Sequence, residues 1–138
     1  MAATIKDLVI LYVEDDRFSR KVIEVLLTDV LPVRKLHLFE NSESFMERLR
    51  GLPDKPSLIF LDIQMKPIDG YEVLKLLRAS DDYKETTAIA LTANVMAHDV
   101  DQLKKVGFDG LIGKPILEDV FAQLIQMIAD GKPVWYIP

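Results

Sequence analysis

The sequence predicts a three-layer α/β sandwich, in which a parallel sheet of five strands lies between two layers of helices. Two observations lead to this fold class. Short apolar runs alternate along the chain with segments whose apolar residues recur at helical spacing. Most of these runs are apolar throughout, which is typical of parallel strands that are covered on both faces. Five runs and five segments fit within 138 residues, a length that suits one domain.

Two strands and two helices are expected in the first half of the chain. Residues 8–13 and 36–39 form the strands. A helix between them is marked by Phe18, Val22, Val25, Leu26 and Val30. The second helix is marked in the same way by Phe45, Met46, Leu49 and Leu52. We expect Asn41 or Ser42 to cap this second helix, because a side-chain oxygen there can accept a hydrogen bond from a free backbone N–H.

Three further strands and helices follow. Residues 58–61, 88–91 and 111–113 are the expected strands. The helices are marked by Tyr71, Val73, Leu74 and Leu77, then by Met96, Val100, Leu103 and Val106, and last by Leu117, Val120, Phe121, Leu124, Ile125 and Ile128. The last apolar stripe is the clearest. Residues 130–138 form a short apolar C-terminal tail, which we expect to pack against its own domain.

Composition and charge exclude several classes of function. The net charge is −5 and the Lys and Arg residues are scattered, so we expect no direct binding of nucleic acid. The chain has no cysteine, which excludes disulfides, a thiol nucleophile and thiolate metal sites. Its apolar runs are too short to span a membrane, and its first residues lack the long apolar segment of a signal peptide. We therefore expect a cytoplasmic protein.

Polar side chains lie directly after, or close to, the ends of four expected strands. Residues 14–16, all acidic, follow the first strand, Asp62 follows the third, Thr92 the fourth and Lys114 the fifth. The carboxyl ends of parallel strands meet at one edge of the sheet, where ligands bind in open α/β folds. Clustered carboxylates repel one another unless a cation joins them, and a nearby ammonium then suits a bound phosphoryl group.

Four short strings, in this order and spacing, resemble the receiver domain of bacterial two-component response regulators. They are Val13-Glu14-Asp15-Asp16, then Leu61-Asp62-Ile63-Gln64-Met65 with Pro67-Ile68-Asp69-Gly70, then Leu91-Thr92-Ala93, and last Gly113-Lys114-Pro115. The resemblance covers residues 7–129, so we expect a single receiver domain over residues 1–138. It implies a flavodoxin-like fold, a (βα)5 sandwich with strand order 2-1-3-4-5.

On this resemblance, Asp62 is the phosphoacceptor. It would take a phosphoryl group from a phosphohistidine on a sensor histidine kinase or a histidine phosphotransfer protein, and so switch the binding of a downstream partner. Thr92 would donate a hydrogen bond to the phosphoryl group, and Lys114 would pair with it as a point charge. The family also places a cis peptide bond between Lys114 and Pro115. Such a protein is a phosphorylation switch and not an enzyme, since it catalyses only its own phosphorylation and dephosphorylation.

The same resemblance implies Mg²⁺ as the cofactor and assigns its ligands. Asp15 and Asp62 would bind Mg²⁺ through carboxylate oxygens, the backbone carbonyl of Gln64 would add a third ligand, and Glu14 would act through water. Because Mg²⁺ favours oxygen ligands, keeps several waters and often bridges to phosphate, this set is chemically coherent. Asp16 is interpreted as the cap of the first helix.

Two positions depart from the family pattern. Lys66 stands where the family commonly has a proline, and we expect it to face solvent. Leu111 stands where many receivers carry a Tyr or Phe that reorients when the hydroxyl of Thr92 engages the phosphoryl group, so an aromatic switch is in doubt. Gln64 and Asn94 flank the site at positions that, by resemblance, tune the access of water and phosphodonor.

Other interpretations stay open at this point. The protein can be a stand-alone response regulator, which we favour, or a receiver from a larger regulator, and a homodimer is also open. An Mg²⁺-dependent aspartyl-phosphate phosphatase would use similar carboxylates and a lysine, but its Asp-x-Asp signature is absent after the first strand. A flavin- or nucleotide-binding module would have a glycine-rich first loop, whereas this loop is acidic.

Overall fold

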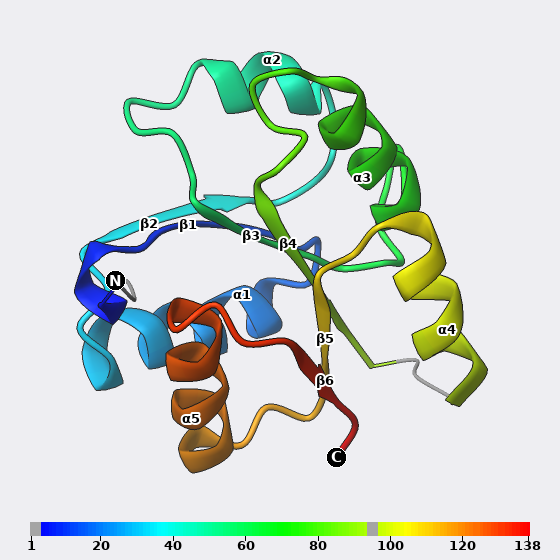
Figure 1. The fold of residues 1–138 in the computed structure, drawn as a ribbon. Coiled ribbons are helices and arrows are strands. Elements are labelled where there is room, and N and C mark those ends of the chain that lie inside the picture. Colours follow the sequence, from blue (N-terminus) through cyan, green and yellow to red (C-terminus); the bar gives the residue numbers. More distant parts are fainter. Residues whose placement is uncertain (1–3, 94–96) are drawn as a thin grey trace.

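One sheet of six parallel strands lies at the centre of the computed structural model, which describes residues 4–93 and 97–138 (Figure 1). The strands are β1 (Val9–Val13), β2 (Lys35–Phe39), β3 (Leu58–Leu61), β4 (Thr87–Thr92), β5 (Gly110–Gly113) and β6 (Val134–Tyr136). Their order is β2-β1-β3-β4-β5-β6, and every neighbouring pair is parallel. The predicted α/β class and the order of the first five strands are confirmed, and β6 extends the sheet beyond β5.

Helices cover both faces of this sheet and complete the three layers (Figure 1). They are the 3₁₀ turn η1 (Ile5–Asp7), α1 (Arg17–Val25), α2 (Phe45–Arg50), α3 (Gly70–Ala79), α4 (Ala97–Val106) and α5 (Glu118–Ala129). One face packs against α1 and α5, and the other against α2, α3 and α4. Each face has its own cluster of buried apolar side chains, so the strands between them are apolar on both sides.

Aromatic rings fill the core on the α1 and α5 side, close to the carboxyl ends of the strands. The rings of Tyr12 and Phe60 meet edge to face with their centroids 6.4 Å apart, and the rings of Phe60 and Phe121 lie 6.3 Å apart. These three side chains are at most 1% exposed. Because such rings bury large apolar areas and also attract one another, this row holds β1, β3 and α5 together. It lies next to the acidic edge, the edge of the sheet at which Glu14, Asp15 and Asp62 follow the carboxyl ends of β1 and β3.

The first helix differs from its prediction. After Val25 the chain continues as one π-helical turn, η2 (Leu26–Val30), which holds more residues than an α-helical turn. The following side chains are rotated accordingly, so that Leu27 is buried and Val30 is exposed. Phe18, which we placed on the apolar stripe, is 76% exposed. An α-helical period cannot anticipate a widened turn, and the predicted stripe was therefore wrong at Val30. Phe18 lies in the first turn of α1, before the widened turn, and the stripe was wrong there because this side chain is not packed in the core.

The start of the second helix also differs. α2 begins after Ser44, whose φ is 48°, and neither Asn41 nor Ser42 caps it. The side-chain oxygen of Asn41 instead accepts hydrogen bonds from the backbone N–H of Glu43 at 3.0 Å and from the guanidinium of Arg48 at 2.9 Å. Asn41 therefore closes the loop that precedes the helix, which starts later than the prediction.

The C-terminal tail packs against its own domain, because its residues form β6. Val134 is buried and Trp135 is half-buried. Two glycines of β5 allow this close approach. A Cβ atom on Gly110 would lie 2.4 Å from the carbonyl oxygen of Val134, and one on Gly113 would lie 2.8 Å from Cδ of Pro138. Only glycine fits at these two positions while the tail lies against β5.

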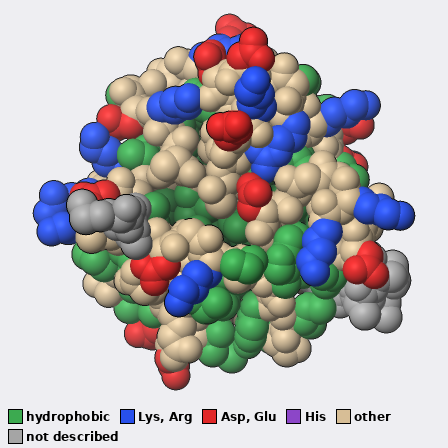
Figure 2. All heavy atoms as spheres, viewed as in Figure 1, with side chains coloured by type: hydrophobic (Ala, Val, Ile, Leu, Met, Phe, Trp, Pro, Cys, Tyr) green, Lys and Arg blue, Asp and Glu red, His purple; other side chains and the backbone are tan. Residues whose placement is uncertain are grey.

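Met96 and Asn94, which the sequence analysis singled out, lie outside the described residues. Gly107 follows α4 with φ of 108°, a conformation that glycine adopts without steric cost. None of the helices in residues 4–93 and 97–138 has the length and apolarity needed to cross a membrane. On the face shown in Figure 2, basic and acidic side chains are intermixed, and hydrophobic side chains gather in its lower part.

Candidate functional site

Strand register brings the predicted polar residues to one edge of the sheet. In the pairing of β1 with β3, the residue before Glu14 lies opposite the residue before Asp62. In the pairing of β4 with β5, Thr92 lies opposite Gly113, and the backbone N–H of Lys114 donates to the carbonyl of Thr92 at 2.9 Å. Segments that are up to a hundred residues apart in the chain therefore meet at the carboxyl ends of β1, β3, β4 and β5.

Glu14 is the buried centre of this cluster, with an exposed fraction of 1%. Its Oε1 accepts hydrogen bonds from the Tyr12 hydroxyl at 3.0 Å and from the Lys114 ammonium. Its Oε2 accepts from the backbone N–H of Asp16 at 3.3 Å. The guanidinium of Arg20 donates to the backbone carbonyl of Glu14 at 2.7 Å. Both the side chain and the backbone of Glu14 are thus held in place from several elements.

Asp62 lies beside this pair at the end of β3 and is also buried. Its Oδ2 is 4.0 Å from the Lys114 nitrogen, and its Oδ1 accepts a hydrogen bond from the backbone N–H of Gln64 at 3.3 Å. Lys114 therefore contacts two carboxylates at once, Glu14 closely and Asp62 at longer range. The peptide bond between Lys114 and Pro115 is cis, as the resemblance implied.

Asp15 adds a third carboxylate and makes the group suitable for a metal ion. One oxygen from each of Glu14, Asp15 and Asp62 lies within 4.8 Å of the others, with Asp15 exposed and the other two buried. Three carboxylates held this close are the donor set that a hard divalent cation such as Mg²⁺ favours. The residues therefore fit the metal that the resemblance implies.

The acidic groups shift one another's ionisation. Burial, together with the hydrogen bond and charge of Glu14, raises the pKa of Asp62 to about 7. Burial also acts to raise the pKa of Glu14, but its hydrogen bonds with Asp62 and Lys114 outweigh this effect and lower it. Burial and the neighbouring Glu14 raise the pKa of Asp15. Without a cation, Asp62 therefore keeps its proton to a higher pH than an ordinary aspartate does, next to an ionised Glu14.

A family comparison agrees with this geometry. A model of the response regulator receiver domain matches residues 10–128, which include the carboxyl ends of β1, β3, β4 and β5 and the residues that follow them. The chain belongs to this family.

Relatives of this receiver domain occur in larger and smaller proteins. It is 29% identical over 125 residues to the signal transduction histidine-protein kinase BarA of Escherichia coli K12, a match that covers 91% of this chain and 13% of BarA. It is 35% identical over 72 residues to the polar-differentiation response regulator DivK of Brucella anthropi, covering 52% of this chain and 58% of DivK. The chain thus spans about an eighth of the length of BarA.

Among solved structures, the receiver domain is similar to the Mn²⁺-bound form of the response regulator Rcp1. The TM-score is 0.72 at 23% sequence identity, and the match covers 88% of this chain and 91% of Rcp1. At this level of identity the similarity concerns the fold.

Several predicted positions have a plain structural role or none at the site. Asp16 caps α1 as predicted, since its side chain accepts hydrogen bonds from the backbone N–H and the hydroxyl of Ser19, both at 2.8 Å. These bonds lower the pKa of Asp16. Asp69 caps α3 by accepting from the backbone N–H of Glu72 at 2.9 Å. The side chain of Lys66 is exposed, as expected.

Two residues named in the sequence analysis, Ser42 and Gly70, support the site in ways that were not predicted. Ser42 is buried and exchanges hydrogen bonds with the backbone of Ile68, so it fastens the loop after Asp62 to the loop after β2. Gly70 begins α3 so close to β3 that a Cβ atom there would lie 2.5 Å from the carbonyl oxygen of Asp62. The Asp-Gly pair in the sequence signals a turn, but it does not show that the glycine lies against the backbone of Asp62.

Leu111 is buried where an aromatic residue is common in the family, and an aromatic ring from the tail lies beside it. Trp135 of β6 is opposite Leu111 in the sheet register and packs on the same face. The ammonium of Lys104 on α4 lies 5.0 Å from the centroid of the Trp135 ring. The tail therefore contacts both β5 and α4, the elements that follow Thr92 and precede Lys114.

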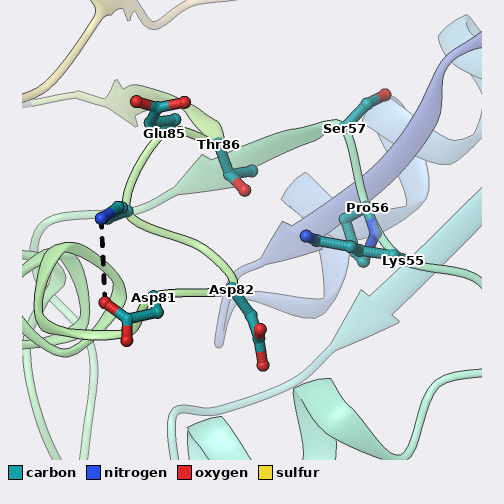
Figure 3. Close-up of a pocket in the computed structure, with 8 residues that line it drawn as sticks. Lys55, Pro56, Ser57, Asp81, Asp82, Glu85 and Thr86 are labelled. Carbon is teal, nitrogen blue, oxygen red and sulfur yellow. Dashed lines mark ion pairs between the residues drawn. The ribbon is translucent and has the colours of Figure 1, made fainter.

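Two hollows in the described surface differ in their chemistry. One, of about 250 Å³, adjoins the acidic edge and is mostly apolar, with Tyr12, Phe18 and Pro115 among its lining residues. The other, of about 500 Å³, lies at the amino ends of β3 and β4 (Figure 3). Its wall contains charges of both signs, and Lys84 pairs there with Asp81 at 3.8 Å. This second hollow is far from the strand ends that carry the acidic group, and we assign it no function.

Proposed function

We propose that this receiver domain accepts a phosphoryl group on Asp62 from the phosphohistidine of a sensor histidine kinase or a histidine phosphotransfer protein. The observation that carries the proposal is the position of Asp62, buried at a strand end beside the carboxylate of Glu14 and the ammonium of Lys114. A carboxylate oxygen of Asp62 attacks phosphorus, the bond from phosphorus to the histidine nitrogen breaks, and the imidazole leaves with that electron pair. The product is an acyl phosphate on Asp62.

The side chains around Asp62 suit the needs of this transfer. Phosphoryl transfer depends on positioning and on neutralising the charge of the equatorial oxygens, and not on covalent help from the protein. Lys114 is close enough to Asp62 to pair with a phosphoryl group there, and Thr92 ends the adjacent strand with its side chain buried. We assign Thr92 the role of hydroxyl donor and Lys114 the role of counter-charge.

The proposed cofactor is Mg²⁺. Asp15 and Asp62 would hold it directly, with the backbone carbonyl of Gln64 as a third ligand and Glu14 acting through water. The close carboxylates of Glu14, Asp15 and Asp62 support this assignment, and so does the related fold of Rcp1, which was solved with Mn²⁺. When bound, the metal supplies positive charge that screens the carboxylates from an incoming phosphoryl group.

The apolar hollow beside Lys114 supports docking of a protein donor. Phe18, at the start of α1, is 76% exposed and lines this hollow together with Val22 and Ile116. A large exposed ring next to an apolar recess is a natural anchor for another protein. A partner that covers this region would bring its histidine close to the acidic edge. The stand-alone arrangement, the downstream partner, a homodimer and the cytoplasmic location stay predictions.

Intact-protein mass spectrometry tests the proposal. Treatment with a small acyl-phosphate donor and Mg²⁺ should add the mass of one phosphoryl group, and omission of Mg²⁺ should prevent it. Asp62→Asn should abolish the addition. Asp81→Asn is the matched control, because Asp81 is exposed at the opposite end of the sheet, and it should be labelled like the wild type. Undiminished labelling of Asp62→Asn would contradict the site assignment.

A further inference from the structure

The buried hydroxyl of Tyr12 has a specific partner at the acidic edge. Tyr12 lies one residue before the end of β1, and its side chain is 0% exposed. The ring packs in the apolar core on the α1 and α5 side, edge to face with Phe60. Its hydroxyl donates to Oε1 of Glu14 at 3.0 Å. A phenol in an apolar core needs such a partner, because a buried polar group without a hydrogen bond is costly.

The same carboxylate oxygen is shared with Lys114. Oε1 of Glu14 accepts from both the Tyr12 hydroxyl and the Lys114 ammonium, while Oε2 accepts from the backbone N–H of Asp16. Glu14 is 1% exposed, so bulk solvent has almost no access to its carboxylate when a donor leaves. Lys114 is also 4.0 Å from Asp62, on which the proposed phosphoryl group would form.

A conflict follows for Lys114. To pair with a phosphoryl group on Asp62, its ammonium has to turn away from Glu14 and toward the oxygens of that phosphoryl group. If Lys114 were the only donor to Oε1 of Glu14, this movement would leave a buried, ionised oxygen without a hydrogen bond. The Tyr12 hydroxyl is a second donor to that oxygen, and it is fixed in position by the packed ring.

We propose that Tyr12 is a positioning residue whose hydroxyl stays on Glu14 while Lys114 moves from Glu14 to the phosphoryl group on Asp62. This inference rests on the proposed function, and it adds a residue that none of the matched sequence strings contains. Tyr12 acts through Glu14 and Lys114 and does not contact the phosphoryl group. If the ring served only to fill the core, removal of its hydroxyl would have the same effect whether or not Lys114 is present.

The first test uses the unphosphorylated protein without Mg²⁺, and measures melting temperatures in a double-mutant cycle at pH 8. Tyr12→Phe is made in the wild type and in Lys114→Met. In the wild type, Lys114 still donates to Glu14, so the loss should be small. In Lys114→Met, the Lys114 hydrogen bond to Oε1 is lost while the hydroxyl still donates to that oxygen, so removal of the hydroxyl should lower the melting temperature by about 5–10 °C more. Equal losses in the two backgrounds would overturn the proposal.

The second test measures the rate of phosphorylation by a small acyl-phosphate donor over a range of Mg²⁺ concentrations. Tyr12→Phe should lower the maximal rate about tenfold, the size of effect expected from one hydrogen bond to a charged group. The Mg²⁺ concentration for half-maximal rate should not change. Tyr83→Phe is the matched control, because Tyr83 is buried near α3 and away from the acidic edge, and it should react like the wild type.

The outcomes separate the two proposals. A wild-type rate in Tyr12→Phe would refute the role of Tyr12 and leave Asp62 as the phosphoacceptor. Absence of labelling in the wild type itself would refute the proposed function, and the exchange by Lys114 with it. If Lys114→Met does not fold, the rate of Tyr12→Phe still decides the inference.

Discussion

The buried carboxyl of Asp62 should make the metal-free protein less stable as the pH rises. Its pKa increases from 3.8 in the unfolded chain to about 7 in the folded protein. Between these values the folded state keeps a proton that the unfolded state has lost, so the free energy of unfolding falls with pH over this range. Asp62→Asn cannot lose a proton there. The variant should therefore gain stability relative to the wild type as the pH rises from about 4 to about 7.

The size of the effect follows from the two pKa values. The raised pKa of Asp62 lowers the free energy of unfolding by about 1.5 kcal/mol at pH 5, where the carboxyl is still protonated in the folded state, and by about 4 kcal/mol at pH 8. The difference in unfolding free energy between Asp62→Asn and the wild type should thus grow by about 2–3 kcal/mol between these pH values. For a domain of 138 residues this corresponds to about 8–10 °C in the difference of melting temperatures.

Thermal melts followed by circular dichroism, from pH 5 to pH 8 in buffer with a chelator, measure this difference. Asp81→Asn serves as the control, because its side chain is 99% exposed and its offset from the wild type should not change with pH. Added Mg²⁺ should narrow the gap at pH 8, since the cation stabilises the ionised group of the wild type. A difference between Asp62→Asn and the wild type that stays constant from pH 5 to pH 8 would refute the reasoning.

Two further predictions concern the third carboxylate and the added strand. Without Mg²⁺, Asp15→Ala should not lower the melting temperature, because it removes an exposed charge next to Glu14. Added Mg²⁺ should stabilise this variant less than it stabilises the wild type. A clear drop in melting temperature without Mg²⁺ would mean that Asp15 holds the loop in place. Gly110→Ala should destabilise the fold by about 1–3 kcal/mol and increase the quenching of Trp135 fluorescence by acrylamide, because the new methyl group would lie against β6. Gly51→Ala, where the nearest atoms are 3.5 Å away, is the neutral control; equal melting and quenching in both variants would contradict this role of Gly110.

The fold and the membership of the acidic edge could be predicted because both depend on local signals. A fully apolar run such as Leu58–Leu61 requires cover on both faces, and the side chain after it must emerge at the carboxyl edge of the sheet. The grouping of Glu14, Asp15 and Asp62 follows from strand register and from the family resemblance.

The supporting contacts could not be predicted, because they depend on how side chains pack in the folded protein and leave no pattern in the sequence. The hydrogen bonds of Ser42 to the loop after β3 join residues 26 positions apart. The exposure of Phe18 depends on how α1 packs against the sheet, and its apolar character alone wrongly placed it on the buried face of the helix. Tyr12 looked like one more strand residue, since nothing in an apolar run shows that a hydroxyl will reach the carboxylate two residues later.

The sixth strand has a practical consequence for work on this protein. The family match ends at residue 128, whereas β6 occupies Val134–Tyr136. An expression boundary placed at the end of the family match would remove β6 and leave the hydrogen-bonding groups of β5 open to another chain, which favours edge-to-edge association. With β6 present, Pro133 and Pro138 flank the outermost strand, and a proline has no N–H with which to extend a sheet. Samples that end before the tail are therefore expected to aggregate more readily than the 138-residue chain.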